Sequence, residues 1–326
     1  MSNTILKSPH LLGLFFLQKI VVRTLIKYSF FYIYPHIHRN RCTKGGTNLF
    51  DISFQDQLDA NILYNKLIQT DSKSVHALSL NKETMTISIF DENWCQQTFI
   101  PVLKWFIQTK KETNWIVSVL ENTFYFKDIE EQEQILCIYQ SIRKGEINDI
   151  PNLPESDQRE EELQAVLESL INSKISFSVD SLITFRLKHY FDQLIPYIEA
   201  AIDEYKLEQE YQAFIQQLRE VLFCTDSTMD EVHLVYNYQF EFFDRNGILI
   251  SKNQLIKFIN RTHFNNYGYY IDSVVLAPLV SIAPKKLYLY TDHTDHYLVQ
   301  TIRNIFQERA TLLPYQQFQM KKWKIN

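Results

Sequence analysis

The chain has 326 residues, of which 45% are apolar and 22% are charged, so it can bury a substantial core and is not disordered as a whole. Its net charge is −5, and no basic stripe of the kind that binds nucleic acid runs through it. Its six glycines and four scattered cysteines exclude a phosphate-binding loop, a GxSxG nucleophile motif and a CxxC metal or redox motif.

Residues 1–48 differ from the rest of the chain in charge. The first 50 residues contain seven Lys/Arg and no acid, whereas the remaining residues contain 26 Lys/Arg and 38 Asp/Glu. The apolar stretch 11–34 is a poor membrane span and a poor signal peptide, because three cations interrupt it. These cations are Lys19, Arg23 and Lys27.

Three interpretations of residues 1–48 remain open. We favour an untranslated leader, because the codons of residues 44–46 can spell a ribosome-binding sequence and Leu49 can be a start codon. The second is a basic amphipathic helix over residues 11–34 that lies on a membrane surface, and the third is an ordinary structured extension. We therefore expect no membrane association unless residues 11–34 are translated.

Residues 49–145 are predicted to form a mixed α/β domain with the element order β-α-β-β-α-α-α. The first strand alternates apolar and polar residues, and the first helix has apolar residues at helical spacing. The strands are expected at 49–54, 75–80 and 84–90, and the helices at 56–69, 95–109, 112–121 and 128–143.

The middle of the chain is predicted to be a linker followed by long helices. Residues 146–160 carry two prolines and a run of charges, which is typical of a solvated linker. Residues 161–225 show helical apolar spacing. The phase of this spacing slips between Tyr205 and Leu207, which predicts a kink or a new helix there, and Pro196 predicts a bend.

Residues 229–315 are predicted to form a C-terminal α/β domain, a β-hairpin followed by a βαβ unit. An Asn-Gly pair at 246–247 favours a tight turn between strands 239–243 and 248–250. Ser251 opens a capping box. The βαβ unit is expected as strand 287–290, helix 295–308 and strand 310–313, followed by a frayed tail at 316–326. The predicted fold class is α+β.

Short packing motifs in the helical and C-terminal regions resemble the YtxC-like family, and the resemblance covers residues 49–315. The motifs are Phe185-Arg186-Leu187 with Tyr190, then Ala200–Tyr205, Glu210-Tyr211, Glu231–Val235 and Thr301–Phe306. The resemblance implies a cytoplasmic protein of a spore-forming bacterium that is connected with sporulation. It implies no enzymatic activity and therefore no catalytic residues or cofactor.

One loop could bind a metal ion. Carboxylates and imidazoles lie close together where strand 287–290 meets the next helix, and both are metal ligands. These residues are Asp292, His293, Asp295 and His296. The alternative, which we favour, is that Thr291, Asp292 or Asp295 caps the helix and that the histidines are exposed loop residues. We therefore predict no metal site.

Three further residues have a functional and a structural interpretation. Arg186 could bind an anion, but an ion pair with a helix acid is the simpler prediction. His189 and His233 could be general bases, but sequence spacing brings no partner to either histidine. We therefore assign them to the surface or to the edge of the core.

The leading hypothesis is a non-enzymatic, cytoplasmic protein that acts through a protein partner of unknown identity. It rests on the resemblance, on the lack of a catalytic motif and on the many tyrosines, which are favoured at interfaces. Scattered cysteines are typical of a reducing compartment. The alternative is an enzyme or ligand-binding protein with an unrecognised site in residues 229–315.

Overall fold

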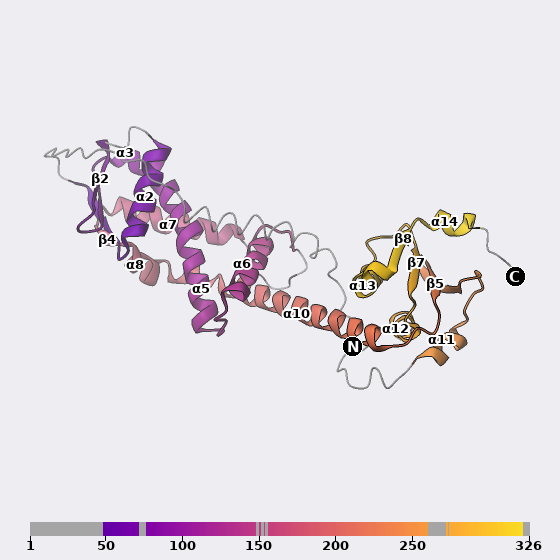
Figure 1. Ribbon diagram of the computed structural model, residues 1–326. Helices are drawn as coiled ribbons and strands as arrows, with labels where there is room; N and C mark the ends of the chain where they lie inside the picture. Colours follow the sequence, from indigo (N-terminus) through magenta and orange to yellow (C-terminus); the bar gives the residue numbers. More distant parts are fainter. Residues whose placement is uncertain are drawn as a thin grey trace. The chain divides into compact units, whose positions relative to one another are not determined.

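The computed structural model describes residues 48–71, 76–147, 150, 153, 156–259, 272 and 274–321. The described residues form two compact units, of which one ends at Lys206 and the other begins at Leu207. Helices and strands build both units, so the predicted α+β class is confirmed. The predictions for residues 1–48 lie outside the described residues, apart from Asn48. Figure 1 labels many of the helices and strands.

The N-terminal unit contains a four-stranded sheet with the order β2-β3-β1-β4. β1 pairs with β3 antiparallel and with β4 parallel. β4 comes from the region that we predicted to be helical, where Phe177 pairs with Ile52 of β1. The strands are β1 (Phe50–Ser53), β2 (Leu78–Asn81), β3 (Thr86–Ile89) and β4 (Phe177–Ser178).

Helices form most of the N-terminal unit. Two π-helical turns, Cys95–Phe99 and Ile107–Lys111, join α3, α4 and α5 into one continuous run, so the predicted break near residue 110 is wrong. A π-helical turn inserts one residue and shifts the apolar phase without ending the helix. The helices are α2 (Gln57–Thr70), α3 (Glu92–Trp94), α4 (Ile100–Phe106), α5 (Glu112–Asn122), α6 (Ile129–Arg143), α7 (Ser156–Asn172), α8 (Val179–Ser181) and α9 (Lys188–Asp192).

Helix α7 begins inside the segment 146–160 that we predicted as a linker. Arg159, in that segment, is only 2% exposed. Its spacing explains this burial, because Arg159, Leu163 and Leu167 recur every four residues and so share one face of the helix. Leu163 and Leu167 are both buried in the core of the unit. The charges around Arg159 hid this periodicity in the sequence.

Helix α10 (Ile195–Cys224) runs without interruption, so the predicted new helix at Tyr205–Leu207 does not exist. Pro196 is the second residue of α10, where a missing backbone N–H breaks no helical hydrogen bond. The apolar phase slips because α10 contributes residues to both units. Ile198 and Ile202 are buried in the first unit, and Ile215 and Leu218 belong to the core of the second.

The C-terminal unit contains a second four-stranded sheet with the order β6-β5-β7-β8. β5 pairs with β6 antiparallel and with β7 parallel, and β7 pairs with β8 parallel, as the predicted βαβ unit requires. The predicted strand at 248–250 is reduced to one bridge between Phe243 and Leu249. The strands are β5 (Glu231–Asn237), β6 (Gln239–Asp244), β7 (Lys286–Tyr290) and β8 (Ala310–Leu313).

The two faces of this second sheet are covered differently. Alternate residues such as Leu234 and Leu289 point into a core shared with α10 to α13. The opposite face is contacted by α14, which packs on β5 and β7, so the tail predicted to fray is helical as far as Met320. The remaining helices are α11 (Lys252–Phe258), α12 (Leu276–Ile282), α13 (Tyr297–Phe306) and α14 (Tyr315–Met320).

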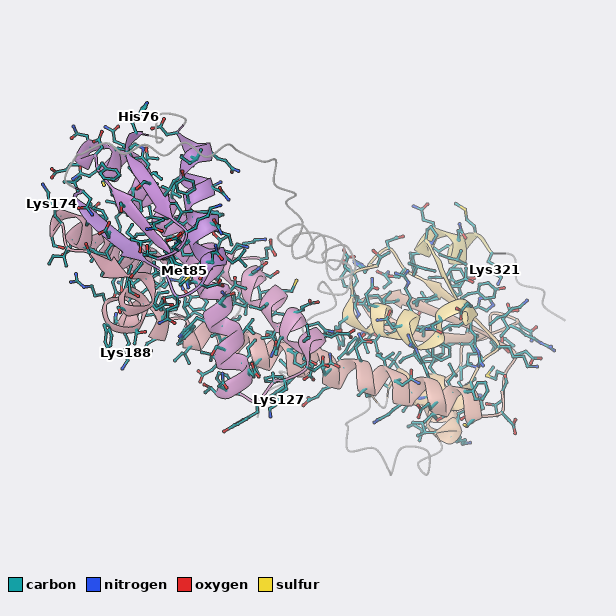
Figure 2. The ribbon with its side chains drawn as sticks, turned by 60° about the vertical axis from the view of Figure 1, so that its left-hand side comes forward. His76, Met85, Lys127, Lys174, Lys188 and Lys321 are labelled. Carbon is teal, nitrogen blue, oxygen red and sulfur yellow. The ribbon has the colours of Figure 1, made fainter. Side chains whose placement is uncertain are left out.

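Figure 2 shows the side chains of both units. It labels Lys321, the last described residue. In the part of the chain that the structure describes, no helix has the length and apolar character needed to cross a bilayer.

Candidate functional site

A buried histidine lies on the face of the second sheet that α14 covers. Side chains on a strand alternate between its two faces, so Glu231 and His233 of β5 share this face. His233 lies beside Tyr288 of β7 and Phe243 of β6 in the strand register. The residue is 0% exposed, and its ring stacks on Tyr288 with the ring centroids 5.0 Å apart.

Both ring nitrogens of His233 have partners. Nε2 lies 2.8 Å from Glu231 Oε1, and Nδ1 lies 3.1 Å from the hydroxyl of Tyr290. A carboxylate can only accept, so Nε2 donates to Glu231. Burial lowers the pKa of His233, which favours the neutral ring, and in that form Nδ1 accepts from the Tyr290 hydroxyl. These hydrogen bonds orient both neighbours.

A lysine closes this cluster from the end of α14. Lys321 Nζ lies 3.1 Å and 3.4 Å from the two ring nitrogens of His233, and 3.9 Å from a Glu231 carboxylate oxygen. Burial lowers the pKa of His233, and the charge of Lys321 lowers it further against the opposing effect of Glu231. Burial also lowers the pKa of Lys321. A positive charge on His233 in addition to that of Lys321 is therefore unfavourable in this cluster.

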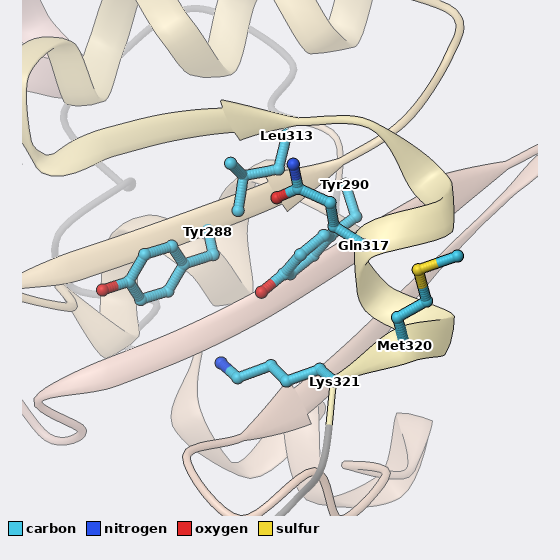
Figure 3. A pocket seen from close by; sticks show the side chains of 6 residues that line it. All are labelled: Tyr288, Tyr290, Leu313, Gln317, Met320 and Lys321. Carbon is cyan, nitrogen blue, oxygen red and sulfur yellow. The ribbon is translucent and has the colours of Figure 1, made fainter.

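A pocket of about 400 Å³ opens between the sheet and α14 (Figure 3). Figure 3 shows Lys321 extending from the end of α14 toward the two tyrosine rings. Burial raises the pKa of Tyr290 to about 12, so its hydroxyl stays protonated at neutral pH. The pocket is lined by Tyr288, Tyr290, Leu313, Gln317, Met320 and Lys321.

The arrangement favours recognition over catalysis. His233 has no exposed surface and is not among the residues that line the pocket, so it cannot transfer a proton to a bound group directly. It acts through its neighbours, because it holds Glu231 and the Tyr290 hydroxyl in place. The pocket then presents apolar walls with an ammonium group, a phenol and an amide, which is the composition of a binding site.

Comparisons with known proteins identify the family. The model of the YtxC-like family matches residues 97–311. The chain belongs to the YtxC-like family. "Uncharacterized protein YtxC" of Bacillus subtilis (strain 168) is 34% identical over 277 residues, which cover 83% of this chain and 96% of the relative. No solved structure matches the chain. The resemblance inferred from the packing motifs is therefore confirmed.

The loop that we considered as a metal site holds α14 in this YtxC-like chain. Asp292 Oδ1 accepts a hydrogen bond of 3.2 Å from the backbone N–H of Tyr315, the first residue of α14. The expectation that Thr291, Asp292 or Asp295 caps the following helix is wrong, because α13 begins after His296 without a side-chain cap. Among the described residues, no three His, Cys, Asp or Glu side chains are placed to hold a metal ion.

The two histidines of this loop contact aromatic rings of the hairpin β5–β6. The His296 ring lies 4.4 Å from the ring of Tyr236, and the His293 ring lies 5.1 Å from that of Tyr238. Burial lowers the pKa of His296, and the neighbouring His293 lowers it further. Both histidines thus support the loop through tilted contacts with aromatic rings. The structure brings neither of them to the α14 pocket.

The other two predicted residues lie in the N-terminal unit. His189 Nδ1 lies 2.9 Å from Glu162 Oε1 and the histidine is exposed, so it does have a carboxylate partner. Arg186 is also exposed. Neither residue lies in the C-terminal unit that contains the pocket.

The sequence analysis missed most of the α14 pocket. One signal was present, because the spacing Glu231-x-His233 within a strand places both side chains on one face. The same spacing relates Tyr288 and Tyr290. Nothing in the sequence indicated that Lys321 would return to this face from the tail.

Proposed function

We propose that the chain acts in sporulation by binding another protein, and that the α14 pocket receives a side chain of this partner. The observation that carries the proposal is the composition of the pocket, with tyrosine, leucine and methionine walls around a few polar groups. Tyr and Met are enriched at protein interfaces, and pockets of this kind hold the anchoring side chain of a partner. Met320 is 78% exposed at the rim, where a partner would first make contact.

The sporulation role and a cytoplasmic location belong to the same proposal. Membership of the YtxC-like family supports the first, because the family resemblance implies a connection with sporulation. The separation of Cys95, Cys137 and Cys224, none of which is in a disulfide, supports a reducing compartment.

A pull-down at native expression tests the proposal. The tag is placed on the N-terminal side of Leu49, because Lys321 lies close to the C-terminus. We expect a stoichiometric partner from sporulating cells that is absent from vegetative cells. Met320→Lys should abolish its recovery, since it adds a second cation beside Lys321 and removes apolar contact area.

Phe223→Lys is the matched control. Phe223 is 86% exposed on α10 in the same unit and is not among the pocket residues, so this variant should recover the partner as the unsubstituted chain does. Equal recovery by both variants would show that the partner binds elsewhere. Loss in both would point to a general effect of added charge.

A second candidate function is the binding of a small ligand in the same pocket. Its volume of about 400 Å³ and its three kinds of polar group favour this alternative. Native mass spectrometry of the purified chain distinguishes the two candidates. A bound mass that Tyr288→Ala abolishes would support a ligand, whereas an unmodified mass together with a captured partner supports the protein interaction.

A further inference from the structure

The helices of the N-terminal unit bury a cluster of charged and aromatic residues away from the α14 pocket. Glu112 is 1% exposed and Arg159 is 2% exposed. Glu112 Oε2 lies 2.5 Å from Nη1 of Arg143, and the hydroxyl of Tyr190 donates to its other oxygen. The side chains come from α5, α6, α7 and α9.

Two aromatic rings contact Arg159 in this cluster. Its guanidinium carbon lies 5.2 Å from the ring centroid of Tyr197 and 5.9 Å from that of Tyr190. Within the described residues, neither Nε nor Nη1 of Arg159 has a hydrogen-bond partner, although both atoms are buried. Cation–π contacts stabilise the charge but satisfy no N–H group.

Tyr139 lies in the same cluster. Its hydroxyl is buried, and its ring lies 6.4 Å from the ring of Tyr197 that also contacts Arg159. Native proteins satisfy nearly all buried polar atoms, with ordered water or an ion where protein groups do not suffice. Two buried nitrogens of Arg159 without a partner among the described residues therefore indicate an occupant that is not part of the chain.

The charges of the cluster indicate what this occupant is. Among the described residues, the carboxylate of Glu112 pairs with the guanidinium of Arg143, and no acid lies within ion-pair distance of Arg159, which leaves the positive charge of Arg159 without a paired counterion. A buried charge without a counterion costs several kcal/mol, and water alone does not neutralise it. A divalent anion would instead leave an excess negative charge. Full burial of the donors also excludes a large ligand.

We propose that a chloride-sized monovalent anion binds in the N-terminal unit against the guanidinium of Arg159. It accepts hydrogen bonds from the unmatched N–H groups, and it neutralises the second guanidinium of the cluster. The bound anion links α7 to the neighbouring helices and stabilises the unit. The proposal does not depend on the function of the α14 pocket.

Thermal unfolding of the full chain tests the proposal. Chloride and bromide are compared with gluconate, which is too large to enter, at equal ionic strength. Tryptophan fluorescence reports on this unit, because three of the four tryptophans, Trp94, Trp105 and Trp115, lie in it. We expect the midpoint temperature of unfolding to rise by about 3–5 °C for each tenfold increase in halide concentration above the dissociation constant of the halide. We expect no such rise in gluconate.

Two variants separate the site from general salt effects. Arg159→Met removes the excess charge and the donors, so its midpoint should be equal in halide and gluconate. Lys104→Met is the matched control, because Lys104 pairs with Glu160 at 2.9 Å and lies outside the cluster. This control should keep the halide dependence of the unsubstituted chain.

A crystal of the unsubstituted chain grown in bromide gives a second measurement that needs no variant. We expect an anomalous peak for bromide within hydrogen-bonding distance of Arg159. Equal midpoints in all salts, or water at this position without an anomalous signal, would overturn the proposal.

Discussion

The two units bury polar clusters that differ in how their hydrogen bonds are satisfied. In the N-terminal unit, Arg159 is covered by aromatic rings and two of its nitrogens have no partner within the described residues. In the C-terminal unit, both nitrogens of His233 are bonded, and the cluster ends in Tyr290 and Lys321 at the wall of a pocket. The Arg159 cluster is buried and has hydrogen-bond donors that no described residue satisfies. The His233 cluster has its ring nitrogens bonded and reaches the wall of the pocket.

This difference shows that burial alone does not identify a functional site. A cluster whose polar atoms are all paired can hold a binding surface rigid without taking part in binding, as His233 holds Tyr290. A cluster with unpaired donors indicates a bound water or ion that satisfies them. The hydrogen bonds and charges of a buried cluster therefore show whether it supports a binding surface or binds a ligand itself. The exposed fraction of its side chains does not.

The largest expected effect comes from removing the carboxylate that pairs with Arg143 in the cluster. Glu112→Ala leaves the half-buried guanidinium of Arg143 and the buried hydroxyl of Tyr190 without this partner, so we expect the free energy of unfolding to fall by about 3–5 kcal/mol. Chemical denaturation of the full chain, followed by tryptophan fluorescence, measures this loss.

An exposed ion pair is the control for this loss. Glu92 and Lys174 lie 2.6 Å apart but are 60% and 45% exposed, so Glu92→Ala should cost less than about 1 kcal/mol. Similar losses for both variants would mean that the Glu112 cluster is hydrated, and the contrast between the two units would disappear.

Local structure was predictable from the sequence wherever a short pattern determines it. The turn at Asp244–Gly247 formed as the Asn-Gly pair predicted, with φ of 78° at Gly247. The capping box at Ser251 is present with both of its hydrogen bonds. Apolar spacing located α13, because this helix buries one face regardless of the rest of the fold.

The sites were not predictable because tertiary contacts create them. Arg159 lies in a charged segment, and only the aromatic rings of α9 and α10 make its burial possible. Lys321 reaches His233 from a tail with no periodic pattern. Asp292 caps α14 and not the nearer α13, so spacing along the chain named the wrong helix.

A change of pH should have a smaller effect on the free energy of unfolding, and this effect should have opposite signs in the two units. The folded pKa of His233 lies below its unfolded value near 6.5, so its stabilising contribution is present above that pH and is lost as pH falls toward the folded pKa. For one titrating group the slope cannot exceed about 1.4 kcal/mol per pH unit. Burial raises the pKa of Glu112, so its contribution is instead lost as pH rises through the folded value.

Hydrogen exchange resolves the two units in one experiment. Lowering the pH from 7 toward 5.5 should reduce the protection of peptides from β5 and β7, after correction for intrinsic exchange, but not that of peptides from α5. His233→Phe should remove this reduction, whereas a substitution at the exposed His189, His189→Gln, should retain it. A parallel loss in both units would contradict the assignment to His233.

The smallest expected effect distinguishes the two interpretations of the loop before α13. Asp292→Ala removes the acceptor for the first N–H of α14, so we expect a loss of about 1 kcal/mol and faster exchange in residues 315–320. Asp295→Ala is the matched control, because the hydrogen bond of Asp295 comes from the adjacent Thr294 at 3.4 Å, and it should leave α14 unchanged. If the loop were a metal site, both variants would abolish a shift of the unfolding midpoint on addition of Zn²⁺. If Asp292 serves the pocket by holding α14, only Asp292→Ala should also weaken capture of the partner.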